Sequence, residues 1–186
     1  GSHNKLLNRT YVYNPDGTIQ ATYDKIHLFD AELRGGQTFR ESDVFAYGDR
    51  AVITDIDGFK IGLTICYDLR FPHLYRTLAH AGAEAIIAPA AYAVGTGPMH
   101  WNALIHARAI ENSVYMLAPA QVGCHAGGRR TYGHSMIVGP WGDTIAELET
   151  NNPGILYTTL NHRVVEDVRN QVHSLHHDRP FSVVMS

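Results

Sequence analysis

The sequence predicts a single α/β domain in which helices cover the faces of a β-sheet. Three observations support this fold class. Pairs of short β-rich runs flank tight turns, as they do in hairpins. Other strand-like runs alternate with helical ones, which is typical of strand–helix–strand units. Finally, the runs at 84–88 and 114–118 are nearly all apolar, as expected for strands buried on both faces.

Hairpins are predicted wherever two β-rich runs flank a turn that contains glycine. They span residues 9–25, 51–65 and 134–148, with turns at Pro15-Asp16-Gly17, Asp57-Gly58 and Pro140-Trp141-Gly142. Further strands are expected at 83–89, 113–120 and 154–160. By contrast, the Gly- and Arg-rich stretch 123–133 predicts a loop.

Proline marks the start of two predicted helices. Pro72 opens the first, which Gly82 closes, and Pro98 opens the second. The apolar face of the second helix is expected to consist of Ala103, Leu104, Ala107 and Ile110. A last helix is predicted at 162–172.

Composition excludes several classes of function. Of 186 residues, 45% are hydrophobic and 18% charged, the balance of an ordinary globular domain. The net charge of −3 makes nucleic acid and anionic membranes poor partners. The longest apolar run, 85–94, is interrupted by Pro89 and falls short of the roughly 18 residues of a membrane span. Two cysteines are too few for a disulfide framework and predict a cytoplasmic protein.

Cys66 is the first candidate for chemistry. In "IGLTICYDLRFP" it ends an apolar strand and precedes a helix, the place where α/β sheets present ligands and nucleophiles. The alternative is a small buried residue that only fills the core.

A nucleophilic thiol needs a base, or a cation that stabilises the thiolate. The 12 histidines are too many to single out one partner. Lysines are few, and Lys25 lies at a strand end among apolar neighbours, whereas Lys5 and Lys60 look solvated. Lys25 is therefore either the partner of Cys66 or a surface lysine whose stem covers apolar residues.

Several motifs occur together in a characteristic order. They are "YDKIHLFD", "FRES", "GLTICYDLRFP", "TGPMHWNALIHARAIEN" and "YGHSMIVGPWG". In this order the chain resembles the nitrilase, or carbon–nitrogen hydrolase, superfamily from about residue 8 to residue 180, and within it the ω-amidase and deaminated-glutathione amidase branch. The resemblance implies a four-layer αββα sandwich and a Glu–Lys–Cys catalytic set that hydrolyses amides through a thioester.

The resemblance also assigns roles to individual residues. Cys66 in "ICYD" matches the nucleophile, Lys25 in "DKIH" the catalytic lysine, and Glu41 in "TFRES" a second, supporting glutamate. The Lys25 ammonium would lower the pKa of the thiol and, with the Tyr67 N–H, stabilise a tetrahedral oxyanion. By analogy with the family, Tyr92 and Thr96 would line the substrate pocket; an ordinary exposed loop is the alternative.

Other polar residues invite weaker assignments. Asp68 and Arg70 are expected to pair and brace the turn under Cys66. His73 stands where the family pattern usually has glutamate. Arg129 and Arg130 either meet an anionic end of the substrate or face solvent. The histidines at 173–177 lack accompanying carboxylate or thiol ligands, so neither a metal nor another cofactor is expected.

One part of the family pattern has no match. The general-base glutamate of the family lies upstream of the lysine, but the only acidic residues before Lys25 are Asp16 and Asp24. Residues 1–3 have the form of a tag remnant, so 4–186 would be the C-terminal two-thirds or so of a carbon–nitrogen hydrolase domain. A longer protein that has been cut is favoured over a short relic or a spliced start.

The predicted function follows from these assignments. A homo-oligomeric enzyme would cleave a small linear amide to a carboxylate and ammonia through a cysteine acyl-enzyme. Without the glutamate, the chain alone is expected to be slower by about a hundred- to ten-thousand-fold. The alternatives are an inactive fragment that serves as an oligomerisation or interaction module, and a Cys–His thiol hydrolase of another family.

Overall fold

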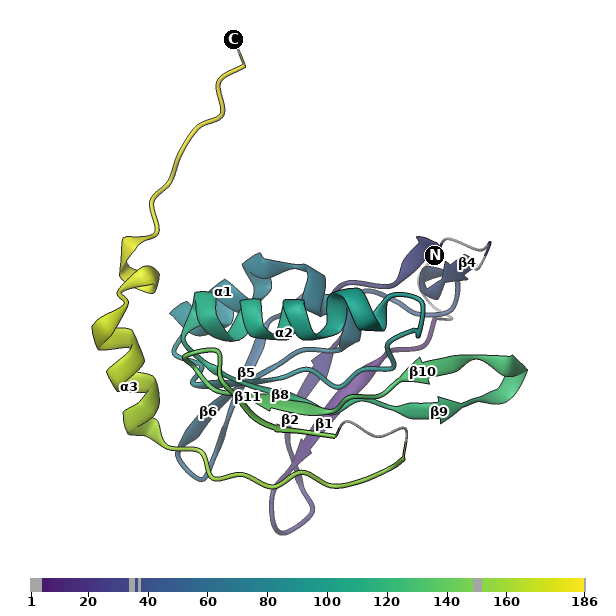
Figure 1. Cartoon of the computed structure of the whole chain (residues 1–186), viewed down its shortest axis with the longest axis horizontal. Coiled ribbons are helices and arrows are strands. Elements are labelled where there is room, and N and C mark those ends of the chain that lie inside the picture. The colour runs from purple at the N-terminus through teal and green to yellow at the C-terminus, as the bar shows by residue number, and fades with distance from the viewer. Residues whose placement is uncertain (1–4, 34–35, 37, 149–151, 186) are drawn as a thin grey trace.

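The centre of the computed structural model, which describes residues 5–33, 36, 38–148 and 152–185, is a six-stranded mixed sheet (Figure 1). Its order is β12-β11-β8-β7-β6-β5, in which β6, β7 and β8 run parallel and the other pairs antiparallel. The strands are β5 (Val52–Ile56), β6 (Phe59–Leu63), β7 (Ala85–Ile87), β8 (Tyr115–Ala118), β11 (Met136–Val138) and β12 (Thr144–Glu147). The predicted hairpins at 51–65 and 134–148 are thus confirmed.

Two helices cover one face of this sheet (Figure 1). They are α1 (Pro72–His80) and α2 (Gly97–Asn112), each with proline in its first turn, where no intrahelical N–H is needed. Apolar side chains from both helices and the sheet form a buried cluster that includes Leu78, Ile86, Trp101, Ile105 and Met116. This cluster fixes the turns between strands and helices, where the candidate site lies.

A hairpin packs on the opposite face of the sheet. β1 (Arg9–Tyr13) and β2 (Ile19–Asp24) pair antiparallel, as predicted. A second cluster joins Tyr23 of β2 to Ile61 and Leu63 of β6 and to Val165 of α3 (His162–Gln171). The α/β prediction is confirmed. Of the four αββα layers that the resemblance implies, the described residues form a helical layer, the six-stranded sheet and a two-stranded hairpin in that order, with α3 packing at the end of the sheet (Figure 1).

Two small ladders extend the framework around the site. β3 (Asp30–Glu32) pairs with β4 (Thr38–Arg40), and β9 (Val122–Cys124) pairs with β10 (Arg130–Tyr132). The loop predicted at 123–133 is therefore wrong, because its two ends form a hairpin. Strands of three residues are too short to show an alternating pattern, and the glycines between them obscured the signal.

The strand predicted at 154–160 is also wrong. In the described part of the chain this segment has no ladder partner, and Ile155 and Tyr157 are 73% and 83% exposed. Alternation of apolar residues predicts a strand only where another strand is available for pairing.

The apolar face predicted for α2 is wrong in part, since Leu104 and Ala107 are half-buried but the other two residues are not. Ala103 and Ile110 are exposed, whereas the buried residues include Trp101, Arg108 and Asn112. Polar side chains can be buried here because they are hydrogen-bonded: Arg108 Nε donates to Leu69 O at 3.0 Å and Asn112 Nδ2 to Arg108 O at 2.9 Å. Hydrophobicity alone could not reveal these partners.

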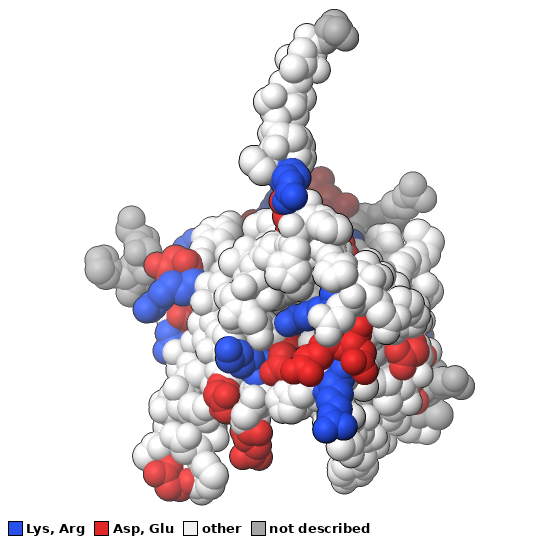
Figure 2. Space-filling view, turned by 90° about the vertical axis from the view of Figure 1, so that its left-hand side faces the viewer, with Lys and Arg blue, Asp and Glu red and all other residues white. Residues whose placement is uncertain are grey.

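The remaining surface features are peripheral to the site. After α3, the short helix η4 (Ser174–His177) leads to a tail that projects from the body (Figure 1). Among the described residues, no cluster of three His, Cys, Asp or Glu has the geometry of a metal site, and no helix is long and apolar enough to cross a membrane. Figure 2 shows basic and acidic side chains interspersed on one face. Residues 1–3, the predicted tag remnant, lie outside the described residues.

Candidate active site

Cys66 sits on a sharp turn between β6 and α1. It is the first residue of a short 3-10 helix, η2 (Cys66–Arg70), and has φ of 50°, a left-handed conformation that costs a non-glycine residue energy. Its backbone N–H donates to Pro89 O at 2.9 Å, which anchors the turn to the segment after β7. Such strained turns at the end of a strand aim a nucleophile into a pocket.

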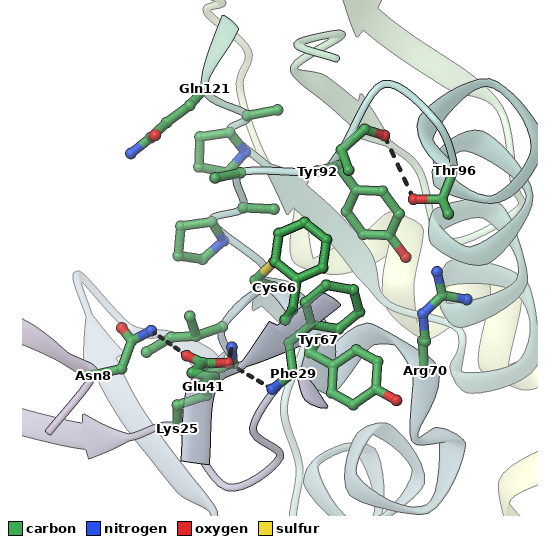
Figure 3. Close-up of a pocket in the computed structure, with 18 of the residues that line it drawn as sticks. Asn8, Lys25, Phe29, Glu41, Cys66, Tyr67, Arg70, Tyr92, Thr96 and Gln121 are labelled. Carbon is green, nitrogen blue, oxygen red and sulfur yellow. Dashed lines mark hydrogen bonds and ion pairs between the residues drawn. The ribbon is translucent and has the colours of Figure 1, made fainter. Parts of the chain in front are cut away.

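Lys25 follows β2 and points into the same pocket (Figure 3). It is only 3% exposed, which rules out a snorkelling surface lysine. Its Nζ donates to Glu41 Oε2 at 2.6 Å. Glu41 opens another 3-10 helix, η1 (Glu41–Asp43), and also accepts from Phe29 N at 2.6 Å and Asn8 Nδ2 at 3.1 Å. Asn8 carried no sequence signal, since a lone asparagine near a strand has many possible roles.

The hydrogen bonds around Glu41 determine its ionisation. Burial by itself raises the pKa of this carboxyl, but hydrogen bonds from Lys25 and the Phe29 N–H, with the charge of Lys25, outweigh it and hold the pKa below its ordinary value of 4.5. Lys25 and Glu41 therefore form an ion pair at neutral pH.

This ion pair predicts acid-dependent stability. Because the pKa of Glu41 is lower in the folded state, its contribution is complete above pH 4.5 and is lost as the pH falls through the folded-state pKa. We expect Glu41→Gln to lower the free energy of unfolding at pH 7 by about 3 kcal/mol, and this deficit to shrink in acid. Urea unfolding of the wild type and the variant at several pH values between 7 and 3 measures this difference in the free energy of unfolding.

The exposed Glu166 of α3 offers a matched control for that measurement. Glu166→Gln should change the free energy of unfolding little at any pH. A deficit of Glu41→Gln that stays constant between pH 7 and pH 3 would contradict the ion pair.

The pKa of the Cys66 thiol is raised overall, although Lys25 was expected to lower it. Burial raises the pKa of Cys66, and Lys25 and the Ala91 backbone amide lower it by less. The predicted effect of Lys25 is thus present, but the predicted net lowering is wrong. The charge of Glu41 also raises the pKa of the thiol and so opposes part of the larger effect of Lys25. Burial therefore favours the protonated thiol over the thiolate in the folded protein.

The pocket in front of Cys66 has a volume of about 1030 Å³. Lys25, Glu41, Cys66, Tyr67, Tyr92 and Thr96, the residues assigned from the sequence, all line it (Figure 3). Tyr67 packs its ring against Phe29 with centroids 4.9 Å apart. Tyr92 is 5% exposed, and among the described residues its buried hydroxyl has no hydrogen-bond partner.

Four arginines also line the pocket, and they differ in pairing. Arg9 binds Asp24 through two hydrogen bonds, and Arg40 binds Glu32 at 2.8 Å. Within the described part of the chain, the other two have no carboxylate partner: Arg70 contacts His100 Nδ1 at 3.1 Å, and Arg129 donates to Ala91 O at 3.0 Å. Arg130, by contrast, does not line the pocket. The unpaired guanidinium groups give the pocket a positive character.

The predicted Asp68–Arg70 pair does not form. Asp68 is fully buried and accepts from Tyr23, His27 and Ile65, whereas Arg70 points toward Tyr92, with its guanidinium carbon 5.6 Å from that ring. A 3-10 helix has three residues per turn, so residues two apart lie on different sides of it. His73, in the place of the family's glutamate, instead packs edge-to-face with the His27 ring, with the ring centroids 5.5 Å apart.

Comparison with known proteins gives consistent matches. The carbon–nitrogen hydrolase family model matches residues 2–170. Deaminated glutathione amidases from Synechocystis sp. and Bos taurus are 42% and 41% identical over 95% of this chain, and the chain spans 65% and 54% of their lengths. The crystal structure of the C. elegans NitFhit protein superposes with a TM-score of 0.88 at 35% identity, covering 95% of this chain and 43% of that one.

Proposed function

The chain belongs to the carbon–nitrogen hydrolase family, and from this we propose that the protein hydrolyses an amide through a thioester on Cys66. The observation that carries the proposal is the shared pocket, in which a strained cysteine and a buried Lys25–Glu41 ion pair line one cavity. The curated relatives are named deaminated glutathione amidase, which favours an amide over a nitrile or an ester as substrate.

The proposed reaction has two halves. Cys66 Sγ forms a bond to the amide carbonyl carbon while a base takes the thiol proton, and the Lys25 ammonium and the Tyr67 N–H stabilise the oxyanion. The C–N bond then breaks, the base gives that proton to the departing nitrogen, and an acyl-thioester remains. Water then adds to the thioester carbon while the base takes one of its protons; the C–S bond breaks, the carboxylate is released and the proton returns to Sγ. Glu41 holds the Lys25 ammonium at the position where the oxyanion forms.

The proton transfers need a base near Sγ. Glu41 is already committed to Lys25, and the family's upstream glutamate has no counterpart among residues 1–24. We therefore propose that full activity belongs to a protein that supplies this carboxylate, and that residues 1–186 alone are slower by about a hundred- to ten-thousand-fold.

Arg70 and Tyr92 support a substrate that carries a carboxylate. A guanidinium without an acidic partner and an unpaired buried hydroxyl lie together on one wall of the pocket (Figure 3). A planar guanidinium binds a carboxylate through charge-assisted hydrogen bonds. We propose that this wall, with Arg129 at the rim, binds an anionic end of the amide substrate.

This assignment predicts a change in substrate selectivity. Arg70→Met should raise KM for a carboxylate-bearing amide by about 10- to 100-fold and leave a neutral amide of similar size nearly unaffected. Arg40→Met is the matched control, because Arg40 lines the same pocket but is already paired with Glu32. Equal losses on the charged and the neutral amide would contradict a carboxylate site.

The leaving group is open to a direct assay. Primary amides release ammonia and secondary amides release an amine, so ammonia detection and an amine-reactive dye should be run on the same panel of carboxylate-bearing amides. If labelling of Cys66 by iodoacetamide abolishes turnover, the result would support the proposed mechanism. Turnover that survives complete labelling would refute it.

We also propose a cytoplasmic location and self-association. Both cysteines are free, which suits a reducing compartment. Apolar side chains of the tail are strongly exposed, among them Phe181 at 89% and Val183 at 83%, and such surface is usually covered by a partner. A non-catalytic oligomerisation module is the second candidate function that this exposure favours. Sedimentation analysis with the amide assays decides between them.

A further inference from the structure

We propose that Asp68 is a positioning residue that holds the lysine-bearing and cysteine-bearing segments in fixed relation to each other. The inference rests on the proposed function, since it concerns the geometry of Lys25 and Cys66. Asp68 does not line the pocket, so it is placed to act through other residues and not on the substrate.

The Asp68 carboxylate is the centre of a buried hydrogen-bond network. It is fully buried, and Oδ2 accepts from the Tyr23 hydroxyl at 2.6 Å and from Ile65 N at 2.8 Å. Oδ1 lies 3.0 Å from His27 N and 2.7 Å from His27 Nδ1. Four donors around one carboxylate satisfy its charge without a paired lysine or arginine.

On the lysine side, the network holds the backbone that follows Lys25. His27 donates directly to Asp68, and Ile26 N donates at 3.3 Å to the Tyr23 hydroxyl, which is itself bonded to Asp68. The His27 ring also stacks on Phe71 with centroids 3.6 Å apart. Asp68 therefore holds the backbone that directly follows Lys25, while Glu41 holds its ammonium.

On the cysteine side, the same carboxylate holds the strained turn. Ile65 directly precedes Cys66 and is the N-cap residue of η2; its N–H donates to the side chain of Asp68 at position N3, as in one half of a capping box. A left-handed conformation at Cys66 persists only if its surroundings stabilise it. One carboxylate thus contacts both segments that form the site.

An amide at this position would not replace the carboxylate. Asparagine has the same shape but only one acceptor oxygen and an NH₂ group, which would face donors from Tyr23, His27 or Ile65. We therefore expect Asp68→Asn to loosen the contact between the two segments even where the fold survives.

A double-mutant cycle on the full chain tests the proposal. The readout is the rate of Cys66 alkylation by iodoacetamide as a function of pH, followed by mass spectrometry, which reports the pKa of the thiol. Lys25→Met should slow alkylation at pH 7 by about 10-fold with Asp68 present, but by less than about 3-fold in the Asp68→Asn background. A merely structural role would leave the effect of Lys25→Met undiminished, and that result would overturn the proposal.

Two further variants keep the test decisive. Tyr23→Phe keeps the Asp68 carboxylate but removes its hydrogen bond from the Tyr23 hydroxyl, so in this background Lys25→Met should slow alkylation by an intermediate factor. If Asp68→Asn does not fold, an undiminished effect of Lys25→Met on alkylation in the Tyr23→Phe background overturns the proposal. Tyr75→Phe is the control, because it removes a buried 2.9 Å hydrogen bond to Thr64 outside the network and should leave the effect intact. Amide turnover is measured separately, on the protein that carries its full catalytic set: if that protein does not turn over amides while Asp68→Asn still diminishes the effect of Lys25→Met on alkylation, the proposed function fails and the positioning role stands.

Discussion

Cys66→Ser lowers kcat/KM for amide hydrolysis by about 10,000-fold or more, the largest effect expected in this protein. The sulfur is the only protein atom in the proposed mechanism that bonds to the substrate, and a serine hydroxyl beside Lys25 is a far weaker nucleophile. The thiol is presented from a turn with φ of 50° that the surrounding hydrogen bonds hold in place. Initial rates on the amide panel, measured on the protein that carries its full catalytic set, give the result.

Cys124 provides the matched control for this substitution. It is the only other cysteine, lies at the exposed end of β9 and is absent from the pocket lining. Cys124→Ser should therefore retain full turnover. A Cys66→Ser variant with more than a few per cent of wild-type activity would mean that another residue attacks the amide.

Lys25→Met is expected to lower kcat by about 100- to 1000-fold, the usual loss when a donor to an oxyanion is removed. The variant also leaves Glu41 partly buried without its cation, so part of any loss could reflect destabilisation. The double variant Lys25→Met/Glu41→Gln removes both charges. It should recover stability in urea unfolding without recovering kcat.

Lys60 provides the control for the loss of a lysine. It is exposed beside the β5–β6 turn, and Lys60→Met should change neither kcat nor the free energy of unfolding appreciably. If the double variant regained wild-type kcat, Lys25 would act only as the structural partner of Glu41, and its proposed role at the oxyanion would be wrong.

Local sequence signals predicted the elements that depend on local interactions. The turns at Gly17, Gly58 and Gly142 all have positive φ, and all three hairpins formed around them. Prolines opened the two helices as expected. Errors arose where the outcome depended on distant partners: 154–160 has no neighbouring strand among the described residues, and α2 buries Arg108 because Leu69 O is within reach.

The candidate site shows the same division. Motif order singled out Lys25, Glu41 and Cys66, which lie 16 and 25 residues apart along the chain and line one pocket in the structure. It did not identify Asn8, which belongs to no local pattern, and it paired Arg70 with the wrong residue, because pairing depends on where the side chains of Asp68 and Arg70 point in the fold. The direction of the thiol shift was also missed, since burial of a side chain depends on packing from several elements.

The sequence by itself determined the family, the three hairpins and the proline-led starts of two helices, because these depend on residue type and local spacing. Only the tertiary structure decided which charges are paired. Asp68 turns inward to four donors instead of pairing with Arg70, and Glu41 offsets the charge of Lys25 beside the thiol. Electrostatic interactions fall off with distance and depend on burial, so ionisation and pairing follow from three-dimensional proximity that spacing along the chain does not specify.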